Sequence, residues 1–584
     1  MAETPPAAPT SRLSILRRFA QLAKAFFFGS RRETRLLVAV LLLLCVAVGV
    51  VQVLVSYAGR NFMTSLAQRD MQGFYHNMWI YVGTFVLAVP IGVFYQYITQ
   101  RLALLWRQWM THLLVKRYFF NRAYYRLQSS TNVDNPDQRI SEDVRSFTSG
   151  VLGYLLTLIN SGVTLVAFIG VLWTISIKLP LVLFLYAGIG TLLSILIGRR
   201  LVGLHFKQYQ KEADFRYGLI RVREYAESIA FFRGEKREHR DLIHRFAEVV
   251  KNTYLIIAWN RTLAFFTQGY NYIALVVPLL IVGPMFIRGN VEFGVVTQAA
   301  GAFASVLAAL SVIVAQFEGL SAFAAGIKRL GELWDELDEF DSEDAAVESE
   351  AQIAVDETAS RLKLSNLTVQ TPHNGKTLTA DLNFVLPPGK SALVMGESGA
   401  GKSSLLRTIA GLWLSGEGSI ERPNLNYLMF LPQRPYMVQG SLRSQLLYPQ
   451  NDADASEENI RDVLEKVNLS EMLERVEGDL DRSVDWANIL SLGEQQRVSF
   501  ARLFLRYPKL AFLDEATSAL DEPNELLLYN QLRKLCISYV SVGHRSTLKA
   551  FHDYLIVLTK DGNVKVTELD QQKPPEAMAQ SDKS

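Results

Sequence analysis

The sequence predicts a bundle of six membrane-spanning α-helices fused to an α/β domain of the P-loop type. Six long uncharged stretches all lie before Glu318, and a strongly acidic segment, residues 332–357, follows them. After that segment, strand-like stretches such as LKLSNLTVQT and SALVMG lead to the glycine-rich loop GESGAGKS and to helix-like residues 403–412. Since 584 residues are too many for one ordinary core, we expect at least two domains.

The uncharged stretches have the length of membrane helices, because roughly 20 residues rising 1.5 Å each cross the hydrocarbon layer. Helices buried in soluble proteins seldom run that far without a charge. The stretches are residues 36–59, 71–100, 146–177, 179–198, 262–287 and 293–317. An even number of spans puts both termini on one side of the membrane.

Basic residues predict the orientation, since cytoplasmic loops near membrane ends carry an excess of Lys and Arg. The N-terminal stretch holds Arg12, Arg17, Arg18, Lys24, Arg31, Arg32 and Arg35. The long loops after the second and fourth spans hold, among others, Arg101, Arg107, Lys116, Arg117, Arg199, Arg200, Lys207, Lys211, Arg221 and Arg223. The opposite connections hold little beyond Arg60, Arg69, Lys178 and Arg288. We therefore expect a multi-pass protein with both termini and both long loops in the cytoplasm.

This topology accounts for the formal net charge of +3, so the charge gives no indication of nucleic-acid binding. The two cysteines, Cys45 in the first span and Cys536 near the end of the α/β region, are too differently placed to suggest a disulfide. Their placement fits a reducing cytoplasmic side.

Composition shifts predict the domain boundaries. Residues 1–35 are expected to form a cytoplasmic N-terminus with an amphipathic elbow helix, because apolar residues from Leu13 to Phe27 recur at helical spacing between basic ones; a flexible basic tail is the alternative. The membrane domain is expected at 36–330, with charged helical loops at 101–145 and 199–261 and a tight hairpin at Lys178 to Pro180. An acidic linker at 331–360, an α/β domain at 361–567 and a disordered tail at 568–584 complete the chain.

The loop GESGAGKS, residues 396–403, matches the P-loop pattern, since it follows a predicted strand and opens a predicted helix. Its glycines let backbone amides wrap phosphates at a helix N-terminus. Lys402 is expected to reach the outer phosphates, and Ser403 to hold Mg²⁺. The predicted phosphate-binding residues are Gly396, Glu397, Ser398, Gly399, Ala400, Gly401, Lys402, Ser403 and Ser404.

The segment LAFLDEATSALD, residues 510–521, is an apolar strand that ends in two acids. Asp514 would hold Mg²⁺ through water, and Glu515 would polarise an attacking water. Alone, two acids after an apolar run more often form a capped turn. Beside a P-loop, the catalytic interpretation is favoured.

Two further segments complete a known pattern: SVGHRS places His544 after a predicted strand, and FLPQRPYM contains Gln433. With the P-loop, LSLGEQQR at 490–497, Asp514, Glu515 and Asp521, they follow the order and approximate spacing of the ATP-binding cassette family, which residues 360–565 resemble. Kinases and GTPases share the P-loop but lack the LSLGEQQR-type signature. The resemblance implies ATP hydrolysis with Mg²⁺, with catalytic residues Glu515, His544 and Gln433, metal-binding residues Ser403, Gln433 and Asp514, and further ATP-binding residues Ser491, Gly493, Glu494 and Asp521.

In this family the signature of one chain completes the ATP site of another, so the resemblance implies a homodimer. The common form is LSGGQ, and this chain has Leu492 at the third position and Glu494 at the fifth. Ser491 and Gly493 are present and Leu492 retains an amide, so we expect an active site. The aromatic residue that usually stacks on adenine is also missing, because Thr371, Pro372 and His373 stand near its place. This implies weaker stacking or a substitute ring from His373.

The membrane half resembles exporter-type half-transporters. NPDQRISEDV at 135–144, ESIAFFRGEKRE at 227–238 and the pair Asp485 and Trp486 resemble the peroxisomal acyl-CoA subfamily and the SbmA/BacA-like bacterial peptide and cobalamin transporters. The resemblance implies a homodimer in the bacterial inner membrane that imports bulky substrates, either antimicrobial peptides such as bleomycin or a corrinoid such as cobalamin. Export of fatty acyl-CoA or lipids is an alternative, and an ATP-gated sensor or channel is another.

Polar residues within the predicted spans are candidates for a cargo cavity, or alternatively for hydrogen bonds between helices. They are Gln52, Tyr57, Tyr95, Asn160, Thr164, Asn271 and Gln298. In the cytoplasmic loops, the acids around Arg139 suggest solvated helix capping. Glu227, Arg233, Gly234 and Glu235 either turn the second loop onto the nucleotide domain or form ordinary surface.

Overall fold

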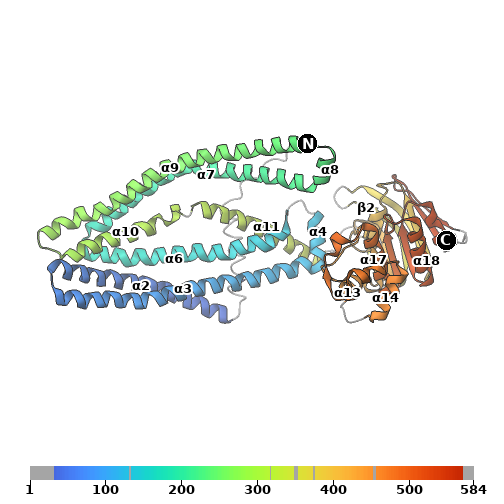
Figure 1. The fold of residues 1–584 in the computed structure, drawn as a ribbon, viewed down its shortest axis with the longest axis horizontal. Coiled ribbons are helices and arrows are strands. Elements are labelled where there is room, and N and C mark those ends of the chain that lie inside the picture. Colours follow the sequence, from blue (N-terminus) through green and yellow to red (C-terminus); the bar gives the residue numbers. More distant parts are fainter. Residues whose placement is uncertain are drawn as a thin grey trace. The chain divides into compact units, whose positions relative to one another are not determined.

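The structure, a computed structural model, describes residues 26, 32–129, 133–315, 317–346, 353–371, 375–450 and 455–569. The chain forms two units, Met1–Ala346 and Val347–Ser584. The first is helical and the second is α/β (Figure 1). Six helices of the described part of the first unit are long and apolar enough to cross a membrane. The predicted fold class is therefore confirmed.

The helical unit is built from a few very long helices. Its elements are α2 (Arg32–Gln68), α3 (Met71–Phe119), a 3-10 turn (Phe120–Arg122), α4 (Ala123–Ser129), α5 (Pro136–Gln138), a π-helical turn (Arg139–Asp143), α6 (Val144–Ile175), α7 (Lys178–Glu224), α8 (Ala226–Phe231), α9 (Glu235–Ile287), α10 (Phe293–Ala315) and α11 (Phe317–Ala346). Helices α3 and α7 continue unbroken past the predicted span ends at Gln100 and Gly198. The charged loops thus extend the membrane helices themselves.

The connection between the third and fourth spans lies slightly earlier than the sequence suggests. Helix α6 ends at Ile175 and α7 begins at Lys178, so Ser176 and Ile177 make the turn. Pro180 belongs to the first turn of α7, where a missing backbone N–H costs no hydrogen bond.

Packing inside the helical unit relies on aromatic side chains. Trp106 of α3 is fully buried and stacks on Phe26 with 5.1 Å between ring centroids. Tyr186 of α7 stacks on Tyr270 of α9 at 4.4 Å, and each hydroxyl donates to the other residue's backbone oxygen, at 2.5 and 3.2 Å. A Cβ on Gly190 would lie only 2.3 Å from the Tyr270 ring, so this close contact depends on a glycine.

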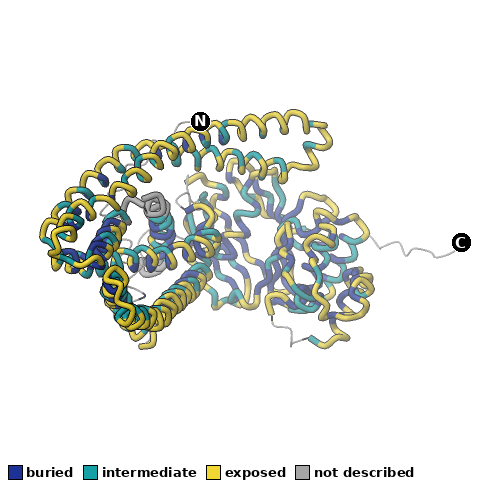
Figure 2. The backbone as a smooth tube through the Cα atoms, turned by 60° about the vertical axis from the view of Figure 1, so that its left-hand side comes forward, coloured by how far each residue is buried: buried dark blue, intermediate teal, exposed yellow. Residues whose placement is uncertain are grey.

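Much of the surface of the long helices is exposed (Figure 2), and many of the exposed side chains are large and apolar. Examples are Leu43, Val86, Val166, Leu181 and Leu280, which are 70 to 78% exposed. Exposed apolar side chains in this number suit contact with lipid, since lipid tails are themselves apolar.

The segment between the two units contains more regular structure than expected. The predicted linker, 331–360, begins inside α11 and ends within strands β1 (Ala354–Asp356) and β2 (Thr358–Gln370). Apolar residues such as Leu330, Leu333 and Leu337 recur along one face of α11 and pack into the helical core. Their packing extends α11 into the acidic stretch. The elbow helix, apart from Phe26, and tail residues 570–584 lie outside the described residues.

The α/β unit contains a large, mainly parallel sheet and a smaller sheet. Beyond β1 and β2, the strands are β3 (Thr377–Leu386), β4 (Ser391–Gly396), β5 (Gly416–Pro423), β6 (Leu428–Leu431), β7 (Gly440–Ser441), β8 (Ser483–Val484), β9 (Leu510–Asp514), β10 (Ser538–Val542), β11 (Tyr554–Leu558) and β12 (Val564–Glu568). The sheet orders are β12-β11-β4-β10-β9-β6, β1-β5-β2-β3 and β7-β8. In the large sheet, only β12 is antiparallel to its neighbour.

Central strands of the large sheet are buried on both faces, as is usual for parallel strands. Leu393, Phe512 and Val540 are all 2% exposed or less. The helices are α12 (Lys402–Ile409), α13 (Leu442–Leu447), α14 (Glu457–Lys466), α15 (Glu471–Arg475), α16 (Trp486–Ile489), α17 (Leu492–Arg506) and α18 (Glu522–Lys534). This sheet fixes the strand ends from which the predicted site residues emerge.

Candidate functional site

Four neighbouring parallel strands deliver the predicted site residues to one edge of the large sheet. The glycine-rich loop follows β4, His544 lies just after β10, Glu515 follows β9 and Gln433 lies just after β6. Ligands of open α/β sheets bind at the carboxyl ends of the strands. The sheet order therefore brings Glu515 and His544 beside the glycine-rich loop, although both are more than a hundred residues from it in sequence.

The glycine-rich loop has a backbone that needs its glycines. Gly396, Gly399 and Gly401 have φ values of 155°, 82° and 90°, and a Cβ on Gly396 would lie 2.3 Å from the Leu558 oxygen. Helix α12 starts immediately after the loop, so its N-terminal amides and dipole favour an anion there. Such a cradle suits phosphate.

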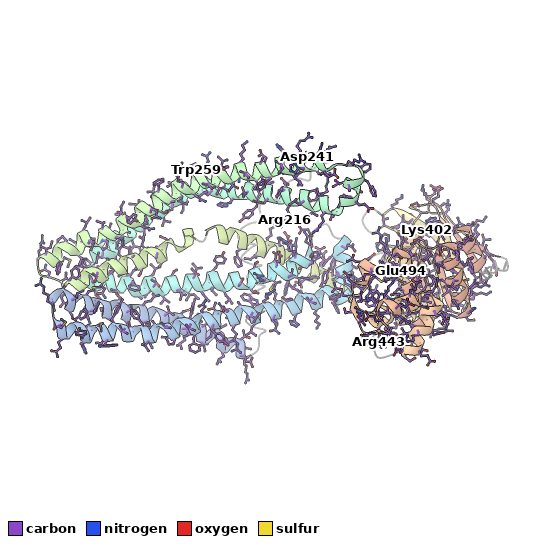
Figure 3. All side chains as sticks on the ribbon, in the orientation of Figure 1. Arg216, Asp241, Trp259, Lys402, Arg443 and Glu494 are labelled. Atoms are coloured by element: carbon purple, nitrogen blue, oxygen red, sulfur yellow. The ribbon has the colours of Figure 1, made fainter. Side chains whose placement is uncertain are left out.

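Lys402 lies inside this loop. Its Nζ donates to the backbone oxygens of Gly396 and Glu397 at 2.9 and 3.0 Å, and the residue is 7% exposed. Burial lowers the pKa of Lys402. Lys402, at the start of α12, and Glu494, on α17, both belong to the α/β unit (Figure 3).

Ser403 and Asp514 form a pair of oxygen donors beside the loop. The Ser403 Oγ donates to Asp514 Oδ1 at 3.0 Å. Burial raises the pKa of Asp514, and the Ser403 hydrogen bond offsets part of this rise. No group of three or more acidic, His or Cys side chains suited to a metal exists among the described residues. One hydroxyl and one carboxylate fit Mg²⁺, which usually takes one or two protein ligands together with phosphates and water.

Of the three residues predicted to be catalytic, Gln433 and His544 each contact the third, Glu515. Gln433 Nε2 donates to Glu515 Oε2 at 2.8 Å, and His544 Nε2 lies 2.9 Å from Glu515 Oε1. Glu515 has a left-handed φ of 47°, and its backbone N–H donates to Val542 at 3.1 Å. Such a backbone costs energy for a non-glycine residue, so the fold holds this carboxylate in place against strain. A carboxylate so placed can accept a proton from water.

The signature segment caps helix α17. Ser491 is the N-cap, and its backbone N–H and hydroxyl donate to Glu494 at 2.8 and 2.9 Å, while the Glu494 amide donates back to Ser491 at 3.3 Å. Arg475 lies 2.6 Å from the second Glu494 oxygen. Burial raises the pKa of Glu494, but the Ser491 and Arg475 hydrogen bonds outweigh it and lower the pKa overall.

Leu492 is the first residue of α17 and is 44% exposed. A Cβ on Gly493 would lie 3.1 Å from the Ala519 oxygen, so a glycine lets the helix approach that loop closely. Asp521 caps α18 through the Asn524 amide at 3.3 Å. Among the described residues, none of the hydrogen bonds of Ser491, Glu494 or Asp521 reaches the phosphate loop.

Two residues with contacts to the candidate site, Gln496 and Lys560, were not predicted from the sequence. Gln496 is 1% exposed; it donates to the Gln433 oxygen and to Ser518 Oγ, both at 3.2 Å, and accepts from the Ala519 amide at 3.0 Å. It therefore links the Gln433 loop, the signature helix and the segment after Glu515. Lys560 pairs with Glu397 of the phosphate loop at 2.8 Å. Gln496 belongs to the signature, which is the one available signal, whereas Lys560 lies in no motif.

The expected adenine-binding region is only partly visible. Thr371 precedes residues 372–374, so Pro372 and His373 lie outside the described residues. The substitute-ring hypothesis for His373 stays a prediction.

The helical unit contains a cavity of about 770 Å³. Four of the polar span residues singled out above line it, namely Gln52, Asn160, Thr164 and Gln298. Tyr57, Tyr95 and Asn271 do not line it. Tyr95 instead accepts a hydrogen bond from Asn160 at 2.7 Å, so for this residue the helix–helix alternative holds.

In the loop between the second and third spans one expectation is wrong, because Arg139 is buried and is not a solvated cap. It is 2% exposed, it donates to the Asp134 backbone oxygen at 2.9 Å, and it lies 3.2 Å from Glu332 of α11. The Arg139 hydrogen bond lowers the pKa of Asp134. In the second loop, Phe231 and Phe232 are 78 and 87% exposed.

Comparisons with known proteins agree along almost the whole chain. Residues 22–287 match the family model "ABC transporter transmembrane region 2", and residues 379–518 match the model "ABC transporter". An uncharacterized ABC transporter ATP-binding protein of Synechocystis is 42% identical, over 94% of this chain and 85% of its own. The chloroplastic ABC transporter D family member 2 of Arabidopsis thaliana is 39% identical, over 94% and 86%. The human lysosomal cobalamin transporter is 31% identical, over 95% and 96%.

The described helices, the phosphate loop beside Asp514 and Glu515, and these matches lead to one conclusion. One membrane domain is joined to one ATP-binding domain, which is half of the usual set. The chain belongs to the ABC transporter family, as a membrane-spanning half-transporter whose α/β domain is an ATPase coupled to transport.

Proposed function

We propose that two copies of this chain pair, bind ATP and Mg²⁺ between their α/β domains, and use hydrolysis to import a bulky polar cargo through the helical bundle. The contact of Glu515 with both Gln433 and His544, beside Lys402, is the observation that carries the proposal. This arrangement offers a proton acceptor next to a phosphate cradle. It lies at the edge of the sheet where ligands bind.

Each residue has a distinct role in this proposal. The loop glycines and Lys402 bind the phosphates, and Ser403 and Asp514 would hold Mg²⁺. When bound, Mg²⁺ neutralises charge on the transferred phosphoryl group. Glu515 accepts a proton from the attacking water, Gln433 orients that carboxylate, and His544 contacts the terminal phosphate.

The signature of the second copy would complete the site. Ser491 and the amides of Leu492 and Gly493 lie at the N-terminus of α17, where backbone N–H groups have no partner within the helix. Such a terminus favours a phosphate. The motion of the paired domains would reach the spans through the long helices of the cytoplasmic loops.

A corrinoid is the first candidate cargo, and a peptide such as bleomycin is the second. The human relative named as a cobalamin transporter supports the corrinoid, and the polar residues of the 770 Å³ cavity suit a cargo rich in hydrogen-bonding groups. A long acyl chain by itself would leave those groups unpaired, which works against a cargo that is mainly acyl; the coenzyme A part of an acyl-CoA could still pair with them. We place the protein in a bacterial inner membrane with cytoplasmic termini, supported by the distribution of basic residues and the Synechocystis relative.

A Glu515→Gln variant tests the catalytic assignment. We expect ATP hydrolysis by the purified protein to fall at least about a hundredfold, because the proton acceptor is lost while the phosphate cradle is kept. ATP should remain bound and the chains should stay paired on size-exclusion chromatography. Glu522→Gln, an exposed glutamate of the same domain, is the matched control and should hydrolyse normally. Hydrolysis at the native rate by Glu515→Gln would contradict the assignment.

Uptake separates the cargoes. Cells that lack this protein, and the same cells expressing it, would be given labelled cobalamin or bleomycin. We expect cobalamin uptake with the native chain and none with Lys402→Ala. Uptake of bleomycin alone would favour a peptide cargo. If neither compound shows ATP-dependent uptake, the import proposal is wrong.

A further inference from the structure

The cavity of the helical unit has two polar stripes. On α6, Thr157, Asn160, Ser161 and Thr164 follow the helical spacing i, i+3, i+4, i+7 and all line the cavity. On α2, the polar residues Gln52, Ser56 and Arg60 lie four residues apart, so they share one helix face, and they also line the cavity. A cavity of about 770 Å³ lies within the range of ligand pockets.

Several groups of these stripes have no partner in the protein. The side chains of Gln52, Thr157, Ser161 and Thr164 form no hydrogen bond to any residue that the structure describes. By contrast, Thr297 and Ser305 of α10 satisfy their hydroxyls on their own helix, at 2.9 and 3.0 Å. Unpaired amides and hydroxyls in a membrane-embedded cavity are suited to bind hydrogen-bonding groups of a ligand.

Arg60 is the one charged side chain that lines the cavity, within the described part of the chain. Its guanidinium lies 5.0 Å from the centre of the Tyr57 ring and donates only to the neighbouring Asn61, at 3.2 Å. It forms no ion pair with a described carboxylate. A guanidinium without a counter-ion in such a place attracts an anion, and its planar donors match a phosphate or a carboxylate.

The backbone around Arg60 is firmly placed. A Cβ on Gly294 of α10 would lie 1.9 Å from the Arg60 oxygen, and the Gly294 amide donates to Thr64 Oγ1 at 3.2 Å. The two helices therefore touch at Arg60. A charge held on packed helices selects a ligand better than one on a loop.

We propose that this cavity binds a bulky organic anion rich in amide or hydroxyl groups, with Arg60 holding the anionic group and the α6 stripe holding the uncharged polar groups. The inference deepens the proposed function and rests on it, since a corrinoid with a phosphodiester and many carboxamides has this chemistry. A cationic peptide would be repelled by Arg60. A fatty acid would satisfy Arg60 but leave the α6 stripe unpaired.

Two corrinoid probes test the charge. Cyanocobalamin carries the phosphodiester, and dicyanocobinamide lacks it but keeps the amide-rich ring. The full chain in proteoliposomes would be titrated with each probe while ATP hydrolysis is followed. For Arg60→Gln, we expect the half-stimulating concentration of cyanocobalamin to rise about tenfold, the size of one charged hydrogen bond, while dicyanocobinamide is unaffected. Arg60→Lys should retain part of the preference, and Arg288→Gln, an exposed outer-loop arginine, is the matched control.

A second variant tests the stripe. Thr164→Val keeps the shape and removes the hydroxyl, so it should weaken both probes to a similar degree. The basal rate of ATP hydrolysis reports that every variant is folded. Equal weakening of both probes by Arg60→Gln, or none, would overturn the role of Arg60 and leave the transport proposal standing.

Other cargo responses separate the two proposals. Stimulation by bleomycin but by neither corrinoid would overturn both the corrinoid cargo and the anion site. Stimulation by oleoyl-CoA alone, lost in Arg60→Gln, would keep Arg60 as an anion site and overturn the corrinoid cargo. Because coenzyme A carries amides and hydroxyls, an unchanged response of Thr164→Val to oleoyl-CoA would then overturn the role of the stripe. If the native chain does not hydrolyse ATP, the proposed function fails. Equilibrium binding of labelled cyanocobalamin to the native protein and to Arg60→Gln then tests the anion site in the cavity. Equal binding by the two proteins would overturn the role of Arg60.

Discussion

Leu492 departs from the usual glycine of the signature in its side chain but keeps the backbone amide. Its side chain is 44% exposed, and as the first residue of α17 it contributes an amide to the helix N-terminus. The usual glycine would contribute the same amide. We therefore predict that the position requires a backbone N–H and that the identity of the side chain is secondary.

Two substitutions at Leu492 separate amide from side chain. Proline is well tolerated at the first position of a helix, so Leu492→Pro should fold and lack only the N–H. We expect Leu492→Ala to hydrolyse ATP within about twofold of the native rate, and Leu492→Pro to lose about tenfold or more, as for a lost hydrogen bond to a charged group. Circular dichroism checks the fold. Equal rates for the two variants would show that this amide does not meet the nucleotide.

At the scale of single residues, sequence motifs predicted most of the candidate site but not its connections. GESGAGKS, Asp514 and Glu515 are recognisable because their chemistry needs particular residue types at fixed spacing. Gln496 escaped notice, because a buried glutamine with three hydrogen bonds looks like any polar helix residue until the strands are assembled. The side-chain pairs of Glu515 with Gln433 and His544 likewise depend on the order of the strands.

At the scale of elements, the pair α7 and α9 depends on one tight aromatic contact. Tyr186 and Tyr270 stack and exchange hydrogen bonds, and Gly190 leaves room for the Tyr270 ring. Tyrosines within a membrane span can satisfy their hydroxyls on a neighbouring helix, which the sequence pattern alone does not reveal.

Gly190→Ala is expected to loosen this pair. The added methyl group would lie 2.3 Å from the ring, so we expect a loss of about 1 to 3 kcal/mol of stability. Gly188→Ala is a matched control on the same helix, because nothing lies within 4 Å of its Cβ position. Thermal unfolding in detergent should fall for Gly190→Ala and stay level or rise for Gly188→Ala. Equal melting temperatures would show that the ring moves aside freely.

The helix boundaries show how far the positions of charged residues can predict where a helix ends. Charge-free stretches locate the membrane spans well, but α3 and α7 run on to Phe119 and Glu224 because charged residues also favour helix once water replaces lipid. Arg139 was expected at a solvated cap, and its burial against α11 arises from contacts between segments almost two hundred residues apart.

At the scale of the whole molecule, an ATP site shared between two chains predicts complementation. Lys402→Ala would disable the phosphate loop, and Gly493→Asp would place a carboxylate at the signature while still suiting the first turn of a helix. Each variant alone should be inactive. In a mixed dimer, one of the two sites combines the intact loop of one chain with the intact signature of the other.

Co-reconstitution of the two variants should therefore restore part of the ATP hydrolysis, in proportion to the share of mixed dimers. Each variant mixed with itself is the control. Failure to recover any activity, while pull-down of differently tagged chains confirms mixed dimers, would argue against a shared site. Full hydrolysis by a monomeric native chain would refute the scheme outright.

Arg60, the one charged side chain among the described residues that line the cavity, has one more consequence, for the membrane that the chain crosses. A polar cavity within a bilayer fills with water. A water-filled path can conduct sodium ions or protons, which would dissipate the membrane potential. A fixed guanidinium raises the electrostatic energy of any small cation that enters, as arginines do in selective pores. The residue proposed to bind an anionic cargo would therefore also reduce the leak of small cations through the empty cavity.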